Sequence, residues 1–173
     1  MSKRDGARGK VKRFLIVFTA VTHLLLIDCV TKELAAGYLK GSAAFSVIPG
    51  LFNFAYVENR GCAWGLLQGQ VWPLAAFALI ALAFLIWKRK DVFMFEALSG
   101  KWRVVSYLAE ILLYAGIIGN LFDRVFRGYV IDMFDFYWGE SHFPCFNVAD
   151  SYICVAAGLI MLISFMVPSK EKK

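Results

Sequence analysis

One stretch decides the fold: residues 146–167 read FNVADSYICVAAGLIMLISFMV. Its 22 residues include a single charged side chain, Asp150. A helix needs about 20 mainly apolar residues to cross about 30 Å of hydrocarbon, so this stretch predicts a membrane span. Asp150 lies in its first turn. Because a charge at a membrane boundary is costly, such a residue usually marks a functional site.

Three further apolar runs precede this stretch, at residues 14–30, 71–87 and 104–122. The whole chain is 60% hydrophobic and only 18% charged, whereas a soluble domain is about half apolar and a quarter charged. We therefore predict an all-α membrane protein of one domain, residues 1–173. Its four transmembrane helices are expected at about 14–34, 70–88, 103–122 and 146–167. The first run also resembles a signal peptide, but it has Asp28 near its end and no small-x-small cleavage site directly after its apolar stretch, which favours a retained anchor.

Lysine and arginine are unevenly divided between the connections. Six precede the first run, five lie between the second and third runs and three follow the fourth, against five in the other two connections together. Because cytoplasmic loops carry the excess of positive charge, both termini are predicted to be cytoplasmic. These anchors account for most of the basic pI of 9.2, so the charge does not indicate nucleic-acid binding.

The two outer connections carry aromatic patterns. Phe52, Phe54 and Tyr56 alternate with other residues after a Pro49-Gly50 turn, which predicts a strand in a small outer β-cradle at about 40–66. Its aromatic face is expected either against lipid or against the helix ends. The second connection begins with an extended candidate at 129–136. The same segment, about 129–144, then continues with the aromatic residues Phe136, Tyr137, Trp138, His142 and Phe143. They predict a short interfacial helix at headgroup level.

Polar residues concentrate at the outer edge of the predicted spans. Lys32 follows Asp28 by four residues, the spacing of a helical ion pair. Asp123 and Arg124 are adjacent, so each is expected to pair with another element. We interpret these four residues as a structural salt-bridge network. No CxxC spacing links the four cysteines; Cys29 and Cys154 fall in spans, and a Cys62–Cys145 disulfide is left open.

Asp132 and Asp150 differ from that network because neither has a cation at helical spacing. The dipole of the fourth helix favours an ionised Asp150, and the apolar neighbours of Asp132 favour a protonated partner. Such a pair can activate water with one carboxylate and protonate a leaving amine with the other. Asn147, Asn59 and Asn120 are candidates for orienting the pair or the substrate. From the residues alone, a proton relay in a small carrier, a cation site or a structural subunit stays open, although no HExxH-type spacing occurs.

Five segments together resemble the bacterial lipoprotein signal peptidases (signal peptidase II). They are DCVTK at 28–32, ENRGCAWG at 58–65, GIIGNLFDR at 116–124, VIDMFDF at 130–136 and FNVADS at 146–151. The resemblance covers almost the whole chain in the family's order. It implies a four-helix aspartyl peptidase of the bacterial inner membrane, with an outer β-cradle, a short periplasmic helix and an active site facing the periplasm.

The resemblance also implies the reaction and its residues. The expected substrate is a prolipoprotein bearing a diacylglyceryl group, cut immediately before the lipidated cysteine; globomycin-type inhibitors are expected to bind, and no cofactor, metal or nucleic acid is expected. The chain is expected to be a monomer. The catalytic pair is Asp132 and Asp150. Substrate-binding or supporting roles are implied for Asn59, Gly116, Asn120, Arg124, Asn147, Ala149, Asp28, Lys32 and Asp123.

Overall fold

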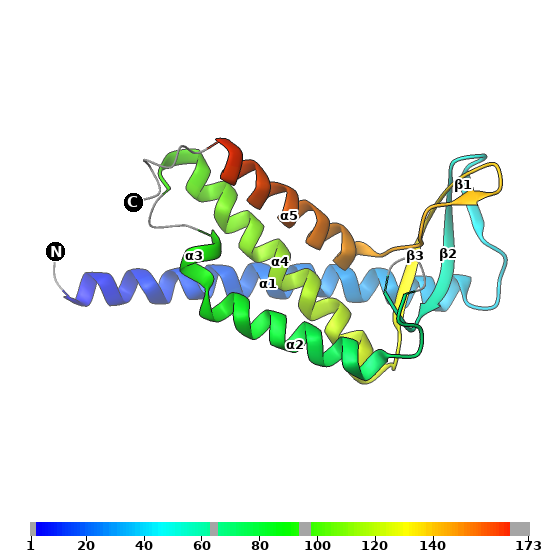
Figure 1. Ribbon diagram of the computed structural model, residues 1–173, viewed down its shortest axis with the longest axis horizontal. Helices are drawn as coiled ribbons and strands as arrows, with labels where there is room; N and C mark the ends of the chain where they lie inside the picture. The colour runs from blue at the N-terminus through cyan, green and yellow to red at the C-terminus, as the bar shows by residue number, and fades with distance from the viewer. Residues whose placement is uncertain (1–2, 63–65, 94–97, 167–173) are drawn as a thin grey trace.

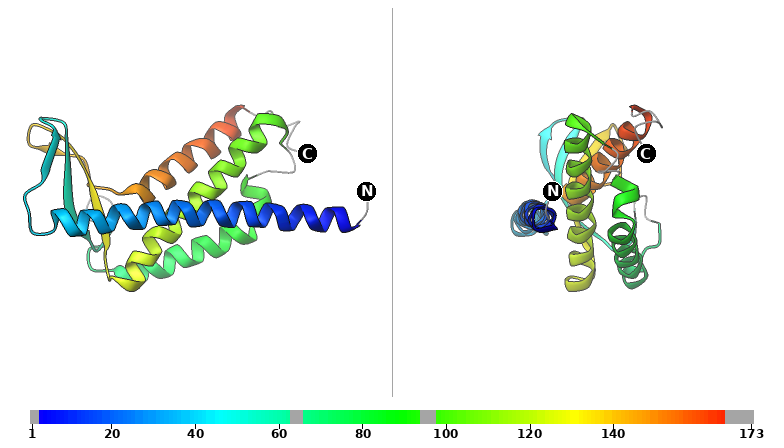
Figure 2. Two further views of the ribbon diagram at one scale, coloured as in Figure 1. Left: turned by 180° about the vertical axis from the view of Figure 1, so that it is seen from behind. Right: turned by 90° about the vertical axis from the view of Figure 1, so that its left-hand side faces the viewer.

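The protein is a bundle of long helices with a small β-sheet at one end (Figure 1). The computed structural model describes residues 3–62, 66–93 and 98–166. The long helices are α1 (Lys3–Leu39), α2 (Val71–Trp87), α4 (Gly100–Phe126) and α5 (Val148–Met166), and the short α3 (Arg89–Phe93) lies in the connection between α2 and α4. The sheet lies where α1 ends and α5 begins (Figure 2).

The bundle is of the membrane type. Among the described residues, three helices contain stretches long and apolar enough to cross a bilayer, at Val11–Leu39, Gly100–Phe126 and Val148–Met166. The shorter α2 has 17 residues, which at about 1.5 Å per residue is close to the thickness of the hydrocarbon. Its Trp72, Phe77 and Ile80 are each about two-thirds exposed or more. Apolar surface on this scale would be a liability in water and is suited to lipid contact.

Helix α4 forms the centre of the bundle and packs against α1, α2 and α5. Two glycines allow the close approach. A Cβ added at Gly116 would lie 2.5 Å from the carbonyl oxygen of Ala149, and one at Gly119 would lie 2.7 Å from Oδ2 of Asp28. Ala149 has no exposed surface. Small residues at these positions therefore let α5 and the polar face of α1 contact the α4 backbone.

The sheet is antiparallel, with its strands in the order β1 (Phe45–Ile48), β2 (Phe52–Asn59), β3 (Val130–Trp138) and β4 (Ser141–His142). Gly50, with φ of 82°, allows the turn between β1 and β2. Phe52 lies opposite Phe136, and Phe54 opposite Phe134. The predicted alternation in β2 is confirmed, since the Phe52 and Phe54 rings lie on one face with their centroids 5.1 Å apart.

The predicted interfacial helix within residues 129–144 is wrong. The chain stays extended from Val130 to Trp138, turns at Gly139 and returns as β4, and Tyr137 lies opposite His142. The positive φ of Gly139 (60°) suits a tight hairpin turn. The aromatic residues therefore stack across strands, as Tyr137 does on His142, instead of sharing one helical face. Residues 63–65 of the predicted cradle and residue 167 of the last predicted span lie outside the described residues.

Candidate active site

Helix α5 begins with a reciprocal cap that holds Asp150. The backbone N–H of Asp150 donates to Oδ1 of Asn147 over 2.9 Å, and the N–H of Asn147 donates to Oδ2 of Asp150 over 3.2 Å. This is the arrangement of a capping box, with an aspartate in the place usually held by Glu or Gln. The cap satisfies amide groups that the first turn would leave without partners. It also fixes the Asp150 carboxylate at the positive end of the helix dipole.

Asp132 projects from β3 towards the same cap. Its Oδ1 accepts a hydrogen bond from Nδ2 of Asn147 over 2.7 Å, and its Oδ2 accepts one from Nδ2 of Asn59 over 2.9 Å. Asp132 is 2% exposed and Asn147 has no exposed surface. Asn147 thus binds both carboxylates, one through its side-chain amide and the other through its backbone. The structure brings together the two aspartates that the sequence singled out.

Asn120 connects this pair to a buried cation. Its Nδ2 donates to Oδ1 of Asp150 over 2.7 Å. Its Oδ1 accepts from Nδ2 of Asn147 and from Nζ of Lys32, each over 3.2 Å. Because Lys32 can only donate, it fixes the amide of Asn120 with its oxygen towards the lysine and its NH2 group towards Asp150.

Lys32 forms the predicted salt-bridge network with Asp28 and Asp123, whereas Arg124, which was also predicted to belong to it, binds backbone carbonyl oxygens instead. Lys32 is 1% exposed, and its Nζ lies 2.7 Å from Oδ2 of Asp28 and 2.8 Å from Oδ2 of Asp123. Asp28 in turn accepts the N–H of Ala149, the second residue of α5, over 2.9 Å. Asp123 also binds Arg127 over 2.9 Å. The network therefore ties α1 to α4 and to the start of α5, directly behind Asp150.

Arg124 holds the loop that follows β2. It donates from Nη2 to the carbonyl oxygen of Gly61 and from Nη1 to that of Asn120, each over 3.2 Å. The N–H of Gly61 donates to Oδ1 of Asn59 over 2.9 Å. A Cβ at Gly61 would lie 2.5 Å from the carbonyl oxygen of Leu66, so this turn requires glycine. The loop thereby orients Asn59 so that its amide nitrogen faces Asp132.

Both aspartates line one cleft of about 500 Å³. Its polar wall includes Asn59, Asn120 and Arg124, and its apolar wall comes mainly from the start of α5 and the segment before it. Gly116 and Ala149 are not among the residues that line this cleft, since they form the contact between α4 and α5. Among the described residues, no group of three or more His, Cys, Asp and Glu side chains is arranged to hold a metal ion.

The environment of Asp132 favours its protonated form. Burial is the main cause that raises the pKa of Asp132 from its ordinary value of 3.8 to about 7, and the charge of Asp150 raises it further. The hydrogen bonds from Asn59 and Asn147 act in the opposite direction. Two interacting carboxylates of which one keeps its proton are the arrangement that provides an acid and a base at neutral pH.

The sequence reasoning missed several residues around the site. Phe143, Pro144, Cys62 and Cys145 line the cleft, and they also line a second, more polar cleft of about 410 Å³ next to it. The cysteines are free thiols, so the disulfide left open above is not formed. Asp135 lines the second cleft, where it binds Nδ1 of His142 over 2.7 Å. Only pairing of β3 with β4 reveals that contact, since seven residues separate the two side chains.

A buried charge at the other end of the bundle was also missed. Glu110 on α4 has no exposed surface and accepts hydrogen bonds from Nε and Nη2 of Arg89, the second over 2.8 Å. The available signal was one acidic residue inside the apolar run at 104–122, preceded by a basic connection. The pair ties the start of α3 to α4, far from the two aspartates.

Known proteins are similar to this chain over most of its length. A family model described as Signal peptidase (SPase) II matches residues 20–166. A lipoprotein signal peptidase of Shewanella pealeana is 38% identical over 157 residues, which is 90% of this chain and 89% of that protein. One of Clostridium acetobutylicum is 40% identical, covering 86% of this chain and 92% of that protein. A bacterial membrane enzyme solved at 1.9 Å by the in meso method superposes with a TM-score of 0.72 at 30% identity, over 88% of this chain and 94% of the other.

Proposed function

The chain belongs to the signal peptidase II family, and from this membership and the geometry of the site we propose that it is an aspartyl endopeptidase of prolipoproteins. The proposed substrate carries a diacylglyceryl group on a cysteine, and the bond broken is the one immediately before that cysteine. Asp132 and Asp150 are the proposed catalytic pair. No cofactor takes part in the proposed reaction.

The observation that carries the mechanism is the position of Asn147 between the two carboxylates. One ionised carboxylate removes a proton from a water molecule as the water oxygen attacks the scissile carbonyl carbon. The protonated carboxyl group then gives its proton to the departing amine, so that the C–N bond breaks and a carboxylic acid and an amine remain. Asn59, Asn120 and Arg124 line the same cleft, where they are suited to bind the peptide backbone.

The two aspartates take different parts in this scheme. Asp150 accepts a backbone N–H of the α5 cap and the amide of Asn120, and the dipole of α5 favours its charged form. It is therefore the proposed base. Asp132, whose pKa of about 7 reflects burial, is the proposed proton donor. Because the two groups interact, they titrate as a pair.

We propose that α1, α2, α4 and α5 all span the bacterial inner membrane, with both termini in the cytoplasm. The distribution of lysine and arginine supports this orientation. In the proposed orientation the sheet and the cleft lie at the outer leaflet, which is the depth at which a lipidated cysteine would lie. The apolar wall that α5 contributes to the cleft suits a lipidated ligand. Globomycin-type inhibitors are the expected competitors, and a monomer is the expected form.

The test is cleavage of a purified lipidated precursor by the reconstituted protein. Asp132→Asn and Asp150→Asn should each abolish product formation while the protein stays monodisperse with a melting temperature near that of the wild type. Asp135→Asn is the matched control, because Asp135 is also a buried carboxylate of β3 but binds Asn53 and His142 instead of the cap. It should keep most of the turnover. Turnover retained by a well-folded Asp132→Asn variant would refute the assignment.

A further inference from the structure

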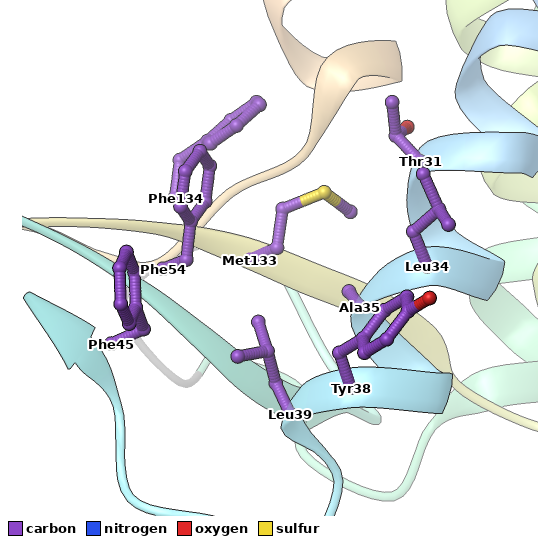
Figure 3. A pocket seen from close by; sticks show the side chains of 9 residues that line it. All are labelled: Thr31, Leu34, Ala35, Tyr38, Leu39, Phe45, Phe54, Met133 and Phe134. Carbon is purple, nitrogen blue, oxygen red and sulfur yellow. The ribbon is translucent and has the colours of Figure 1, made fainter. Parts of the chain in front are cut away.

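A further cavity, apart from the two clefts beside Asp132, lies between α1 and the sheet. It has a volume of about 530 Å³, and its lining side chains converge from the last turns of α1 and from β1, β2 and β3 (Figure 3). We call it the α1–sheet groove, lined by Thr31, Leu34, Ala35, Tyr38, Leu39, Phe45, Phe54, Met133 and Phe134. Its lining is almost wholly apolar, and the hydroxyl of Thr31 is already bound to the carbonyl oxygen of Asp28.

The groove is separate from the site of the two aspartates. Successive side chains of a strand point to opposite faces, so Met133 lies on the reverse face of β3 from its neighbour Asp132. Met133 and Ile131 pack against Ala35 of α1. None of the residues that line the groove lines the cleft of Asp132 and Asp150. A ligand in the groove would therefore contact Met133 on the reverse face of β3 and Phe134 further along the same strand, without contacting Asp132.

The groove continues the lipid-facing side of α1. Ile27, Val30, Leu34 and Tyr38 follow one another at spacings of three and four residues, so they form one stripe along the helix. Each of them is at least half exposed, and Leu34 and Tyr38 line the groove. The apolar stretch that could cross the membrane ends at Leu39. The stripe therefore leads from the middle of the span directly into the groove.

We propose that the α1–sheet groove binds one acyl chain of a bilayer phospholipid. The almost wholly apolar lining offers water few hydrogen-bond partners, so water binds in the groove only weakly. A hydrocarbon chain that already lies along the stripe of α1 can enter by bending over Leu34. Aromatic rings at Phe45, Phe54 and Phe134 then pack around the chain. This inference goes beyond the proposed peptidase activity and does not depend on it.

Photolabelling tests the proposal without any activity measurement. The full chain is reconstituted in phosphatidylethanolamine vesicles in which a small fraction of the lipid carries a diazirine in the middle of one acyl chain. After illumination, labelled peptides are mapped by mass spectrometry. Peptides with Tyr38, Phe45 and Met133 should be labelled several times more than the lipid-facing Phe77 and Ile80 of α2. Equal labelling of the two regions would overturn the proposal, because it would show only general contact with lipid.

A matched pair of variants checks that the groove itself binds the chain. Leu34→Asn places an amide in the groove, and Leu15→Asn makes the same change on α1 outside it, at a similar exposure (51% and 54%). Leu34→Asn should reduce labelling of Met133 to the level of α2, and Leu15→Asn should leave it unchanged. Equal labelling of Met133 in both variants would overturn the proposal. So would loss of the label on adding excess peptide with a diacylglyceryl cysteine, since the groove would then hold a substrate chain.

Discussion

Replacing Asn147 separates its role in the helix cap from its role at the two carboxylates. Asn147→Ser keeps a side-chain oxygen that can cap α5, because Ser and Asn are about equally good at this position. It removes the Nδ2 group that donates to Asp132 and to Asn120. Asn147→Ala removes the capping oxygen as well.

The expected magnitudes follow from the hydrogen bonds that each substitution removes. Loss of an N-cap side chain costs about 1 kcal/mol, so the alanine variant should be less stable than the serine variant by about that amount. Asp132 becomes charged as it gives its proton to the departing amine, and a hydrogen bond to a charged group contributes about 1.5–3 kcal/mol. If the bond from Asn147 to Asp132 acts fully in the transition state, both variants should lose roughly 10- to 150-fold in kcat/KM, at about 1.4 kcal/mol for each factor of ten.

Two measurements on the same preparations test this reasoning. Thermal unfolding in detergent gives the order of stability, and cleavage of a lipidated precursor gives kcat/KM. The serine variant should have nearly normal stability and an activity as low as that of the alanine variant. If the serine variant cleaves at the wild-type rate, Asn147 serves only as a helix cap and the proposed link between the two carboxylates is refuted.

Two further predictions concern pH and packing. Because the pKa of Asp132 is raised to about 7, its protonated form should stabilise the fold fully below about pH 4. This stabilisation should be lost as pH rises through 7. Turnover that needs the proton of Asp132 should be lost over the same range. Asp132→Asn should flatten the loss of stability in a pH series of melting temperatures, and turnover still rising above pH 8 would contradict the assignment. Gly116→Ala should destabilise the protein by about 1–3 kcal/mol through contact with Ala149, whereas Gly158→Ala on α5, where a Cβ meets nothing within 4 Å, should be neutral or slightly stabilising in the same melting assay.

The parts of the site that local spacing determines were predictable from the sequence. The Asp28–Lys32 pair follows from helical geometry four residues apart, and the structure confirms it. The alternation of Phe52 and Phe54 likewise follows from the two-residue period of a strand. The sequence also indicated Asp132 and Asp150, because a carboxylate next to an apolar run is energetically costly and usually marks a functional site.

Contacts between distant segments were not predictable in the same way. The interfacial helix was expected because a cluster of aromatic residues suits both a headgroup-level helix and a twisted sheet, and only the pairing of β3 with β2 and β4 decides between them. One of the two roles of Asn147 was predictable, because its spacing to Asp150 indicated an interaction. Its hydrogen bond to Asp132 was not, because that bond depends on where β3 lies.

The contact between Asp28 and the backbone of Ala149 has a consequence for assembly in the membrane. Lys32 lies on the same helix, so the first helix enters the bilayer with its own counter-ion and at a reduced cost. The other oxygen of Asp28 finds its partner only when α5, the last of the described helices, has been inserted. Asp150 arrives in that same event. A chain still under synthesis thus holds an incomplete pair of acids, and the proposed catalytic pair is assembled only when the bundle closes.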